Sequence, residues 1–478
     1  MNLRLTASIL GKLLMLFSFS FILPLIAAHV FEEPYHPFLI PAALSLLVGA
    51  VLGYGIKTES EFDSLRHKES FAIVALIWLF MSIFGSIPYI IFGISPVDAF
   101  FESMSGFTTT GASVLTPEEL PKSLLLWRSL TQWIGGMGII VLFLAIFPNV
   151  AKRSTVLFQA EYSGVSLSKL KPRIRDTALS LYKVYLLLTI AEVALLYALG
   201  LSLFDAINHA FTTLSTGGYS THSESIAFFK DVRVEAVVAF FAFLGGANFA
   251  LIYFLLSGKP VIFRNTEFRA YVCFLALASV VIAAVNLDRY SIFESLRYSI
   301  FQAVSIMTTT GFTTADFDAW SDSAKLILVV LMFIGGSSGS TGGGIKVIRI
   351  YLLIKYAVHQ ILRAAEPRTV RAVKFEGRAI KKEILDDIAA FFVLYILIFA
   401  VSSILVSLSG YDIVTSISAT ATTLGNVGPG LGLAGAAENY ASFPSLTKIL
   451  LAVNMWIGRL EIFTVVSLFI PTFWRERW

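Results

Sequence analysis

Four short segments of the sequence, rich in threonine and serine, end in glycine. In chain order they are Thr108-Thr109-Thr110-Gly111, Leu214-Ser215-Thr216-Gly217, Thr308-Thr309-Thr310-Gly311 and Thr422-Thr423-Leu424-Gly425. Each segment lies between two hydrophobic runs of membrane-spanning length. Glycine allows a backbone to turn its carbonyl oxygens inward without a Cβ clash, and such carbonyls replace the water ligands of a dehydrated cation. Four such segments in one chain predict an ion pathway surrounded by four sets of backbone oxygens.

None of the four segments carries a charged side chain, which favours a large, weakly hydrated monovalent cation over a divalent one. We therefore predict K⁺ as the transported ion, with no organic cofactor bound by the chain. The predicted selectivity filter comprises Thr109, Thr110, Gly111, Ser215, Thr216, Gly217, Thr309, Thr310, Gly311, Thr423, Leu424, Gly425 and Asn426. The predicted K⁺ ligands within it are Thr110, Gly111, Thr216, Gly217, Thr310, Gly311, Leu424 and Gly425.

A simpler interpretation is that these segments are packing motifs, because threonine and glycine are common where membrane helices touch. One Thr-Thr-Thr-Gly segment would fit that interpretation. Four segments with the same flanking pattern favour the ion pathway.

The composition indicates an all-α polytopic membrane protein. Of the 478 residues, 56% are hydrophobic and only 14% are charged, with a mean hydropathy of +0.78. The single cysteine, Cys273, excludes an intrachain disulfide and a thiolate metal site. We expect no enzymatic activity, because the sequence has neither a His-rich metal motif nor paired intramembrane carboxylates.

Ten hydrophobic runs are long enough to span a bilayer. They cover about 7–29, 38–56, 71–93, 124–147, 182–200, 234–256, 269–286, 324–360, 385–408 and 447–470, and the eighth is interrupted in its middle. The first run could be a signal peptide, but it is longer than a usual signal core and we expect a retained helix. Lysine and arginine gather in alternate connecting segments, which predicts cytoplasmic N- and C-termini.

The spans after residue 70 repeat one plan: helix, short re-entrant helix, Thr-Gly segment, helix. We predict a two-helix preface over 1–70, followed by four pseudo-symmetric repeats around one central pore. The repeats cover 71–181, 182–268, 269–384 and 385–478. Asp98, Asp205, Glu294 and Asp412 stand 12 to 17 residues before the glycines, where an acid caps a short helix. The partly negative C-terminal helix ends then face the pore and favour a cation.

A second alignment appears in the last helix of each repeat. The four sequences are Trp133-Ile134-Gly135-Gly136, Phe243-Leu244-Gly245-Gly246, Phe333-Ile334-Gly335-Gly336 and Trp456-Ile457-Gly458-Arg459. Arg459 therefore stands where three repeats have glycine, near the middle of a span, where a charge must face protein or water. We expect it to be a fixed positive charge below the filter. The alternative is a structural ion pair with a buried acid such as Glu192.

The interrupted run contains six glycines, three serines and a threonine over 335–344. Glycine disfavours helix, and open backbone at membrane depth is tolerated only inside protein or along a cavity. We predict a movable gate formed by Gly336, Ser337, Ser338, Gly339, Ser340, Thr341, Gly342, Gly343 and Arg459. A simple kink or connector is the alternative. Lys346 does not follow glycine with the spacing of a phosphate-binding loop, so nucleotide binding is not expected.

These residues resemble the Trk/Ktr/HKT superfamily of potassium transporters, and most closely its bacterial TrkH/TrkG branch. The similarity covers essentially the whole chain and lies in the four filter glycines, residues 339–344, Gly425-Asn426-Val427-Gly428-Pro429-Gly430 and Arg459. The resemblance implies K⁺ uptake across the bacterial inner membrane, with Rb⁺ as a surrogate ion. It also implies a homodimer and a cytosolic, TrkA-like nucleotide-binding ring. Gly111, where HKT relatives with serine tend towards Na⁺, argues for K⁺.

Two questions stay open at this point. The basic segment 346–382 suits a docking site for a regulatory ring and equally a contact with anionic lipid headgroups. The alternative to a channel-like pathway is a secondary transporter that couples K⁺ or Na⁺ entry to H⁺ or Na⁺. No nucleic-acid partner is expected.

Overall fold

The computed structural model describes residues 2–55, 67–138, 174–366 and 372–474. This part of the chain is helical apart from loops and one two-stranded antiparallel hairpin, β1 (Lys374–Phe375) with β2 (Arg378–Ala379). The predicted all-α fold class is confirmed.

The helices are grouped here by the predicted repeats. The preface contains α1 (Leu3–Ser18), α2 (Ile22–Val30) and α3 (His36–Tyr54). Repeat one contains α4 (His67–Ile91), α5 (Pro96–Phe107) and α6 (Lys122–Met137). Repeat two contains α10 (Ile174–Ala198), α11 (Leu203–Leu214), α12 (Val232–Gly245) and α13 (Phe249–Leu256). Repeat three contains α14 (Thr266–Val285), α15 (Ile292–Met307), α16 (Asp322–Ile334) and α17 (Val347–Ala365). Repeat four contains α18 (Lys382–Ser407), α19 (Ile413–Gly425), α20 (Ser445–Arg459), α21 (Ile462–Val466) and α22 (Pro471–Trp474).

The membrane spans differ from the ten expected. Among the described residues, six helices are long and apolar enough to cross a bilayer, and two further spans are pairs bent by 107° and 117°. The bent pairs are α12 with α13, and α20 with the segment Ile462–Phe469.

The spans expected over 234–256 and 447–470 are therefore bent pairs of helices, and the second half of 124–147 lies outside the described residues. The sequence predicted a break only in repeat three. The inner helices of repeats two and four also bend, because a Gly-Gly or Gly-Arg pair precedes each bend and weakens the helix there. In repeat two, the Asn248 side chain then caps a new helix.

Each short helix begins at a polar cap. In the first three repeats a serine, Ser95, Ser202 or Ser291, accepts a hydrogen bond from the backbone N–H of the acid three residues later. Only the fourth repeat uses the acid itself, since the Asp412 side chain accepts from the backbone of Val414 and Thr415. The acids thus mark the helix starts as predicted, but three of them lie in the first turn, where they meet the positive end of the helix dipole.

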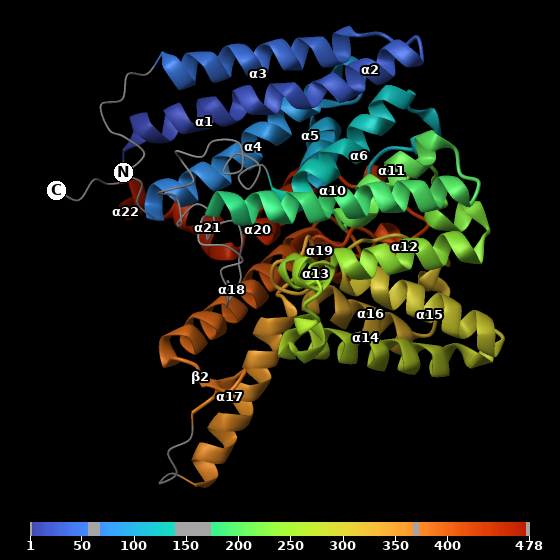
Figure 1. The fold of residues 1–478 in the computed structure, drawn as a ribbon, viewed down its shortest axis with the longest axis vertical. Coiled ribbons are helices and arrows are strands. Elements are labelled where there is room, and N and C mark those ends of the chain that lie inside the picture. Colours follow the sequence, from blue (N-terminus) through green and yellow to red (C-terminus); the bar gives the residue numbers. More distant parts are fainter. Residues whose placement is uncertain (1, 56–66, 139–173, 367–371, 475–478) are drawn as a thin grey trace.

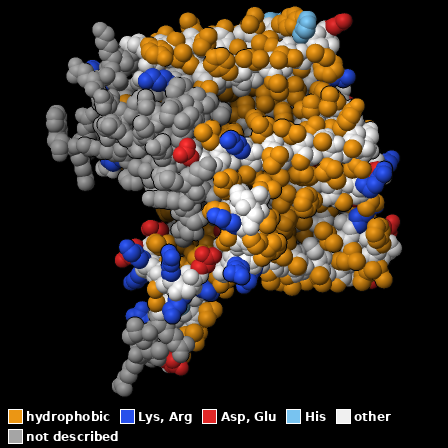
Figure 2. Space-filling view, viewed as in Figure 1, with side chains coloured by type: hydrophobic (Ala, Val, Ile, Leu, Met, Phe, Trp, Pro, Cys, Tyr) orange, Lys and Arg blue, Asp and Glu red, His pale blue; other side chains and the backbone are white. Residues whose placement is uncertain are grey.

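The helices form one bundle, from which α17 and the hairpin project (Figure 1). Figure 2 shows hydrophobic side chains covering the broad face of the bundle, with charged side chains gathered at its edges and around the projecting part. Exposed residues such as Leu277, Val280 and Leu397 belong to this surface. An apolar belt of this size is stable only against lipid or another protein.

Candidate ion pathway

The C-terminal end of every short helix turns in the same way. Thr109, Thr216, Thr309 and Asn426 adopt left-handed backbone conformations, with φ of 53°, 54°, 63° and 56°. Two residues later a glycine is again left-handed, with φ of 82° at Gly111, 78° at Gly218, 81° at Gly311 and 101° at Gly428. We call residues 108–111, 215–218, 308–311 and 425–428 the pore segments.

A hydrogen bond fixes the register of each pore segment. The residue between the two left-handed positions donates its N–H to the carbonyl five residues earlier, as at a Schellman helix end. The four bonds run from Thr110 to Ser105, Gly217 to Thr212, Thr310 to Ser305 and Val427 to Thr422, each 2.8 Å long. The equivalent residues are therefore Thr110, Gly217, Thr310 and Val427.

This register corrects the alignment of Thr-Gly endings in two repeats. The structural counterpart of Gly111 is Gly218 in repeat two and Gly428 in repeat four, instead of Gly217 and Gly425. Ser215 caps α11, while Thr423, Leu424 and Gly425 form the last turn of α19.

Sequence reasoning missed Gly218, Val427 and Gly428 as pore-segment residues. The signals for them were the doubled glycine at 217–218 and Asn426, since asparagine adopts the left-handed conformation more readily than other residues.

The four pore segments form a closed ring. A Cβ built on Gly111 would lie 2.1 Å from the carbonyl oxygen of Gly217 in the next repeat. The same contact joins Gly218 to Thr310 at 1.9 Å, Gly311 to Val427 at 2.1 Å and Gly428 to Thr110 at 2.6 Å. Each of these positions requires glycine for two reasons. Its φ is positive, and a neighbouring carbonyl oxygen occupies the place that a Cβ would take.

A cavity opens on either side of this ring. The first is lined by all four left-handed glycines, by Arg128 of α6, and by residues after the pore segments such as Tyr219 and Tyr440. The second is lined by the Gly135-Gly136 pair of α6, residues of the 335–344 loop, Lys346, Arg459 and Glu461. The ring therefore separates the two cavities. We call the first the outer vestibule and the second the inner chamber.

The glycine-rich loop, residues 335–344, lies directly against the inner side of the ring. The Thr341 hydroxyl donates to the carbonyls of Leu214 at 2.9 Å and Gly245 at 3.0 Å. The N–H of Gly343 donates to the Thr309 hydroxyl at 2.7 Å. A Cβ on Gly343 would lie 2.4 Å from the carbonyl oxygen of Gly425. The loop thus contacts repeats two, three and four. In a simple kink, its carbonyl and N–H groups would form hydrogen bonds only within their own helix.

Arg459 joins this loop to repeat one. Its guanidinium donates to the carbonyl of Thr341 at 2.6 Å and to those of Gly135 and Gly136 at 2.8 and 3.0 Å. Glu192 is not the partner, since neither of its carboxylate oxygens has a hydrogen-bond partner among the described residues. Glu461 instead forms an ion pair with Arg349, 2.8 Å long.

A second cation holds the loop. The Lys346 ammonium donates to the carbonyl oxygen of Gly342, next to the Thr341 carbonyl that Arg459 binds. Lys346 also has a left-handed backbone, with φ of 85°. Two neighbouring carbonyls of the loop are therefore held by two positive side chains.

These features define a class of protein: a polytopic membrane protein in which four pseudo-equivalent pore segments enclose one axis. The TrkH sequence profile, described as a cation transport protein, matches residues 36–476. The chain belongs to this family.

Named relatives agree with this assignment. The Trk system potassium uptake protein TrkH of Salmonella typhimurium is 39% identical, with both chains covered completely. The TrkG protein of Escherichia coli K12 is 33% identical over 99% of each chain. The crystal structure of the potassium transporter TrkH from Vibrio parahaemolyticus superposes with a TM-score of 0.89 at 36% identity, covering 99% of this chain and all of that one.

Proposed function

We propose that the chain is a K⁺ uptake subunit of the cytoplasmic membrane, with a channel-like, gated pathway along the axis of the four pore segments. The closed ring of main-chain carbonyls and glycines is the observation that carries this proposal. Relatives over the full length of the chain are named potassium uptake proteins.

In this proposal a K⁺ ion loses its water in the outer vestibule and regains oxygen ligands from the pore segments. The pore segments contribute only uncharged groups, and the short helices direct their partly negative C-terminal ends towards the axis. Both features stabilise a monovalent cation without holding it too tightly to leave.

The glycine-rich loop is the proposed gate. It occupies the inner side of the ring in the present conformation, and Arg459 and Lys346 hold its carbonyls. Conduction then requires the loop to leave the axis, which breaks these bonds. The positive charge of Arg459 adds an electrostatic barrier to a cation in the inner chamber.

The Lys- and Arg-rich end of the bundle is the proposed cytoplasmic side. Helix α17 projects there (Figure 1). Arg363 near its end and Lys374, Arg378 and Lys381 of the hairpin region are exposed, and they give a regulatory ring of the TrkA kind, or anionic lipid headgroups, a basic surface to bind. A homodimer belongs to the same proposal.

The proposal is tested with purified protein in liposomes. We expect ⁸⁶Rb⁺ uptake, and a reversal potential that follows the K⁺ gradient alone as the H⁺ and Na⁺ gradients are varied. A reversal potential that moves with the H⁺ or Na⁺ gradient would instead establish a coupled secondary transporter.

We expect Lys346→Met to raise basal ⁸⁶Rb⁺ flux by about three- to tenfold, because it removes one hydrogen bond, worth about 0.5–1.5 kcal/mol, from the proposed closed loop. The matched control is Lys355→Met on the same helix, whose ammonium donates to the carbonyl of Lys374, away from the loop. Equal flux in the two variants would remove Lys346 from the gate.

A further inference from the structure

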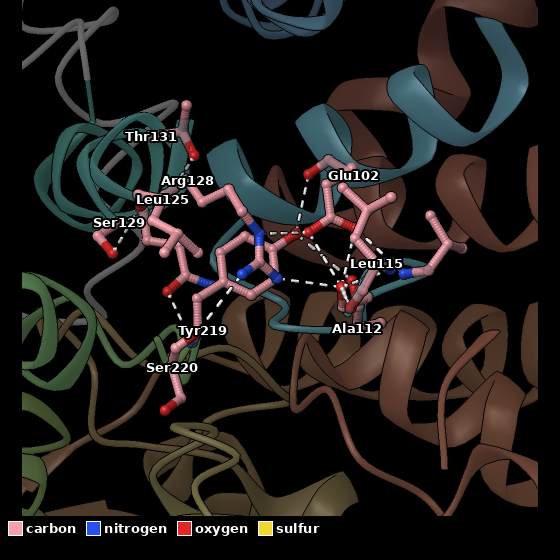
Figure 3. Close-up of polar contacts among 12 residues, drawn as sticks. Glu102, Ala112, Leu115, Leu125, Arg128, Ser129, Thr131, Tyr219 and Ser220 are labelled. Carbon is pink, nitrogen blue, oxygen red and sulfur yellow. Dashed lines mark hydrogen bonds and ion pairs between the residues drawn. The ribbon is translucent and has the colours of Figure 1, made fainter. Parts of the chain in front are cut away.

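The outer part of repeat one contains a buried ion pair that the proposed pathway does not itself require. Arg128 on α6 donates through Nε to Glu102 on α5 at 2.8 Å, and the two side chains are 2% and 0% exposed. Figure 3 shows these side chains pointing towards each other, close to Ala112 and Leu115, which follow the first pore segment. A buried pair of this kind adds little net stability compared with apolar residues of similar volume. A role in conformation therefore accounts for the pair better than a role in stability does.

Glu102 holds the chain that leaves the first pore segment. Its carboxylate accepts from the Ser113 hydroxyl at 3.1 Å and from the N–H of Val114 at 3.1 Å. Ser113 also accepts from Arg128 Nη2 at 3.0 Å. The carboxylate thus fixes the backbone two and three residues after Gly111.

Arg128 and the residue one turn later, Gln132, hold the second pore segment. Arg128 Nη1 donates to the carbonyl of Ser220 at 3.4 Å, and its guanidinium lies 4.2 Å from the ring centre of Tyr219. Gln132 donates to the carbonyl of Gly217 at 2.7 Å and accepts from the N–H of Tyr219 at 3.0 Å. Residues i and i+4 share one helix face, so this face of α6 contacts the segments of repeats one and two together.

The other repeats lack this face. The residues equivalent to Arg128 and Gln132 are Val238 and Ala242 in repeat two, Leu328 and Met332 in repeat three, and Leu451 and Met455 in repeat four. The residues equivalent to Glu102 are His209, Gln302 and Ala419. The first two make neutral versions of the same contact, since His209 bonds Ser220 at 3.0 Å and Gln302 bonds Thr314 at 3.4 Å. At these three equivalent positions, charged side chains and a polar inner-helix face therefore occur in repeat one and not in the other three repeats.

We propose that Glu102, Arg128 and Gln132 are positioning residues that set the carbonyl geometry of the first two pore segments and thereby the preference for K⁺ over Na⁺. They act through Ser113, Val114, Gly217 and Tyr219 and need not touch the ion. An arginine fork and a fully bonded carboxylate restrict these segments more tightly than the neutral contacts of repeat three. A ring of carbonyl oxygens that cannot contract around the ion disfavours the smaller Na⁺. The role depends on the K⁺ conduction proposed above.

The chain itself supplies the test variants. Gln132→Met introduces the residue type of repeats three and four, and the double variant E102Q/R128L introduces the residues of repeat three without leaving a buried charge unpaired. We expect both to fold and to conduct, with the K⁺ to Na⁺ permeability ratio from bi-ionic potentials reduced about fivefold in Gln132→Met and further in the double variant. The charge-preserving variant E102D/R128K should retain most of the preference.

The control is E235Q/R297Q, which removes an ion pair on the outer side of repeats two and three, 2.6 Å long and away from the ring. A permeability ratio equal to wild type in Gln132→Met and in E102Q/R128L overturns the positioning role. An equal loss in the control overturns it as well. If the double variant does not fold, the permeability ratio of Gln132→Met alone tests the positioning role. A wild-type protein whose potential ignores K⁺ would instead disprove the conduction on which the role depends.

Discussion

Gly218→Ala is expected to reduce ⁸⁶Rb⁺ flux by roughly ten- to thirtyfold, because a left-handed non-glycine residue costs about 1–2 kcal/mol and the site has no room for a Cβ. The backbone φ at Gly218 is 78°, and the added Cβ would lie 1.9 Å from the Thr310 carbonyl oxygen. That oxygen belongs to the ring and cannot move without opening it. The measurement is flux in liposomes, normalised to the amount of folded protein.

The matched control is Gly217→Ala, one residue earlier. The φ of Gly217 is not positive, and its new Cβ would meet the side-chain amide of Gln132 at 2.4 Å, so it displaces that side chain and its bonds to Gly217 and Tyr219 and leaves the ring carbonyls in place. We therefore expect a smaller loss of flux than in Gly218→Ala. A larger loss of flux in Gly217→Ala than in Gly218→Ala would support Gly217 as the counterpart of Gly111. It would contradict the register derived from the helix-end hydrogen bonds.

Arg459→Met is expected to raise basal flux by at least roughly tenfold, since losing even one hydrogen bond from a charged donor removes about 1.5–3 kcal/mol from the proposed closed loop. The variant removes the donor that joins the carbonyls of Thr341, Gly135 and Gly136. It also removes the positive charge from the inner chamber. Both changes act in the same direction.

Arg459→Lys separates the two contributions. Lysine keeps the charge but offers a single ammonium in place of a planar fork, so it cannot reach carbonyls of two repeats with the same geometry. We expect its flux to lie between those of wild type and Arg459→Met. A methionine variant that conducts like wild type would show that neither the charge nor the bonds of Arg459 limit passage.

The sequence predicted the class of fold and the neighbourhood of the pore segments well. Their recurrence was visible because threonine and glycine stand between hydrophobic runs in all four repeats. The register was not predictable in repeats two and four, since it depends on where the short helix ends. Tertiary contacts fix that end. From the sequence alone, either of the adjacent glycines at 217–218 could take the left-handed position equivalent to Gly111.

The bends of the inner helices and the buried ion pair of repeat one were missed for different reasons. A Gly-Gly pair weakens any helix, but only packing against the ring decides that the chain turns there. Glu102 and Arg128 did carry a signal, because charges at membrane depth usually mark a functional or paired site. Their pairing across two helices appears only when α5 and α6 are placed together.

Anomalous diffraction from crystals soaked in Rb⁺ tests the central claim most directly, because it locates the ion without relying on flux. The proposed pathway predicts an anomalous peak on the axis of the ring, at carbonyl distance from Thr110, Gly217, Thr310 and Val427. A peak away from that axis, or Rb⁺ bound only at acidic surface groups, would contradict it.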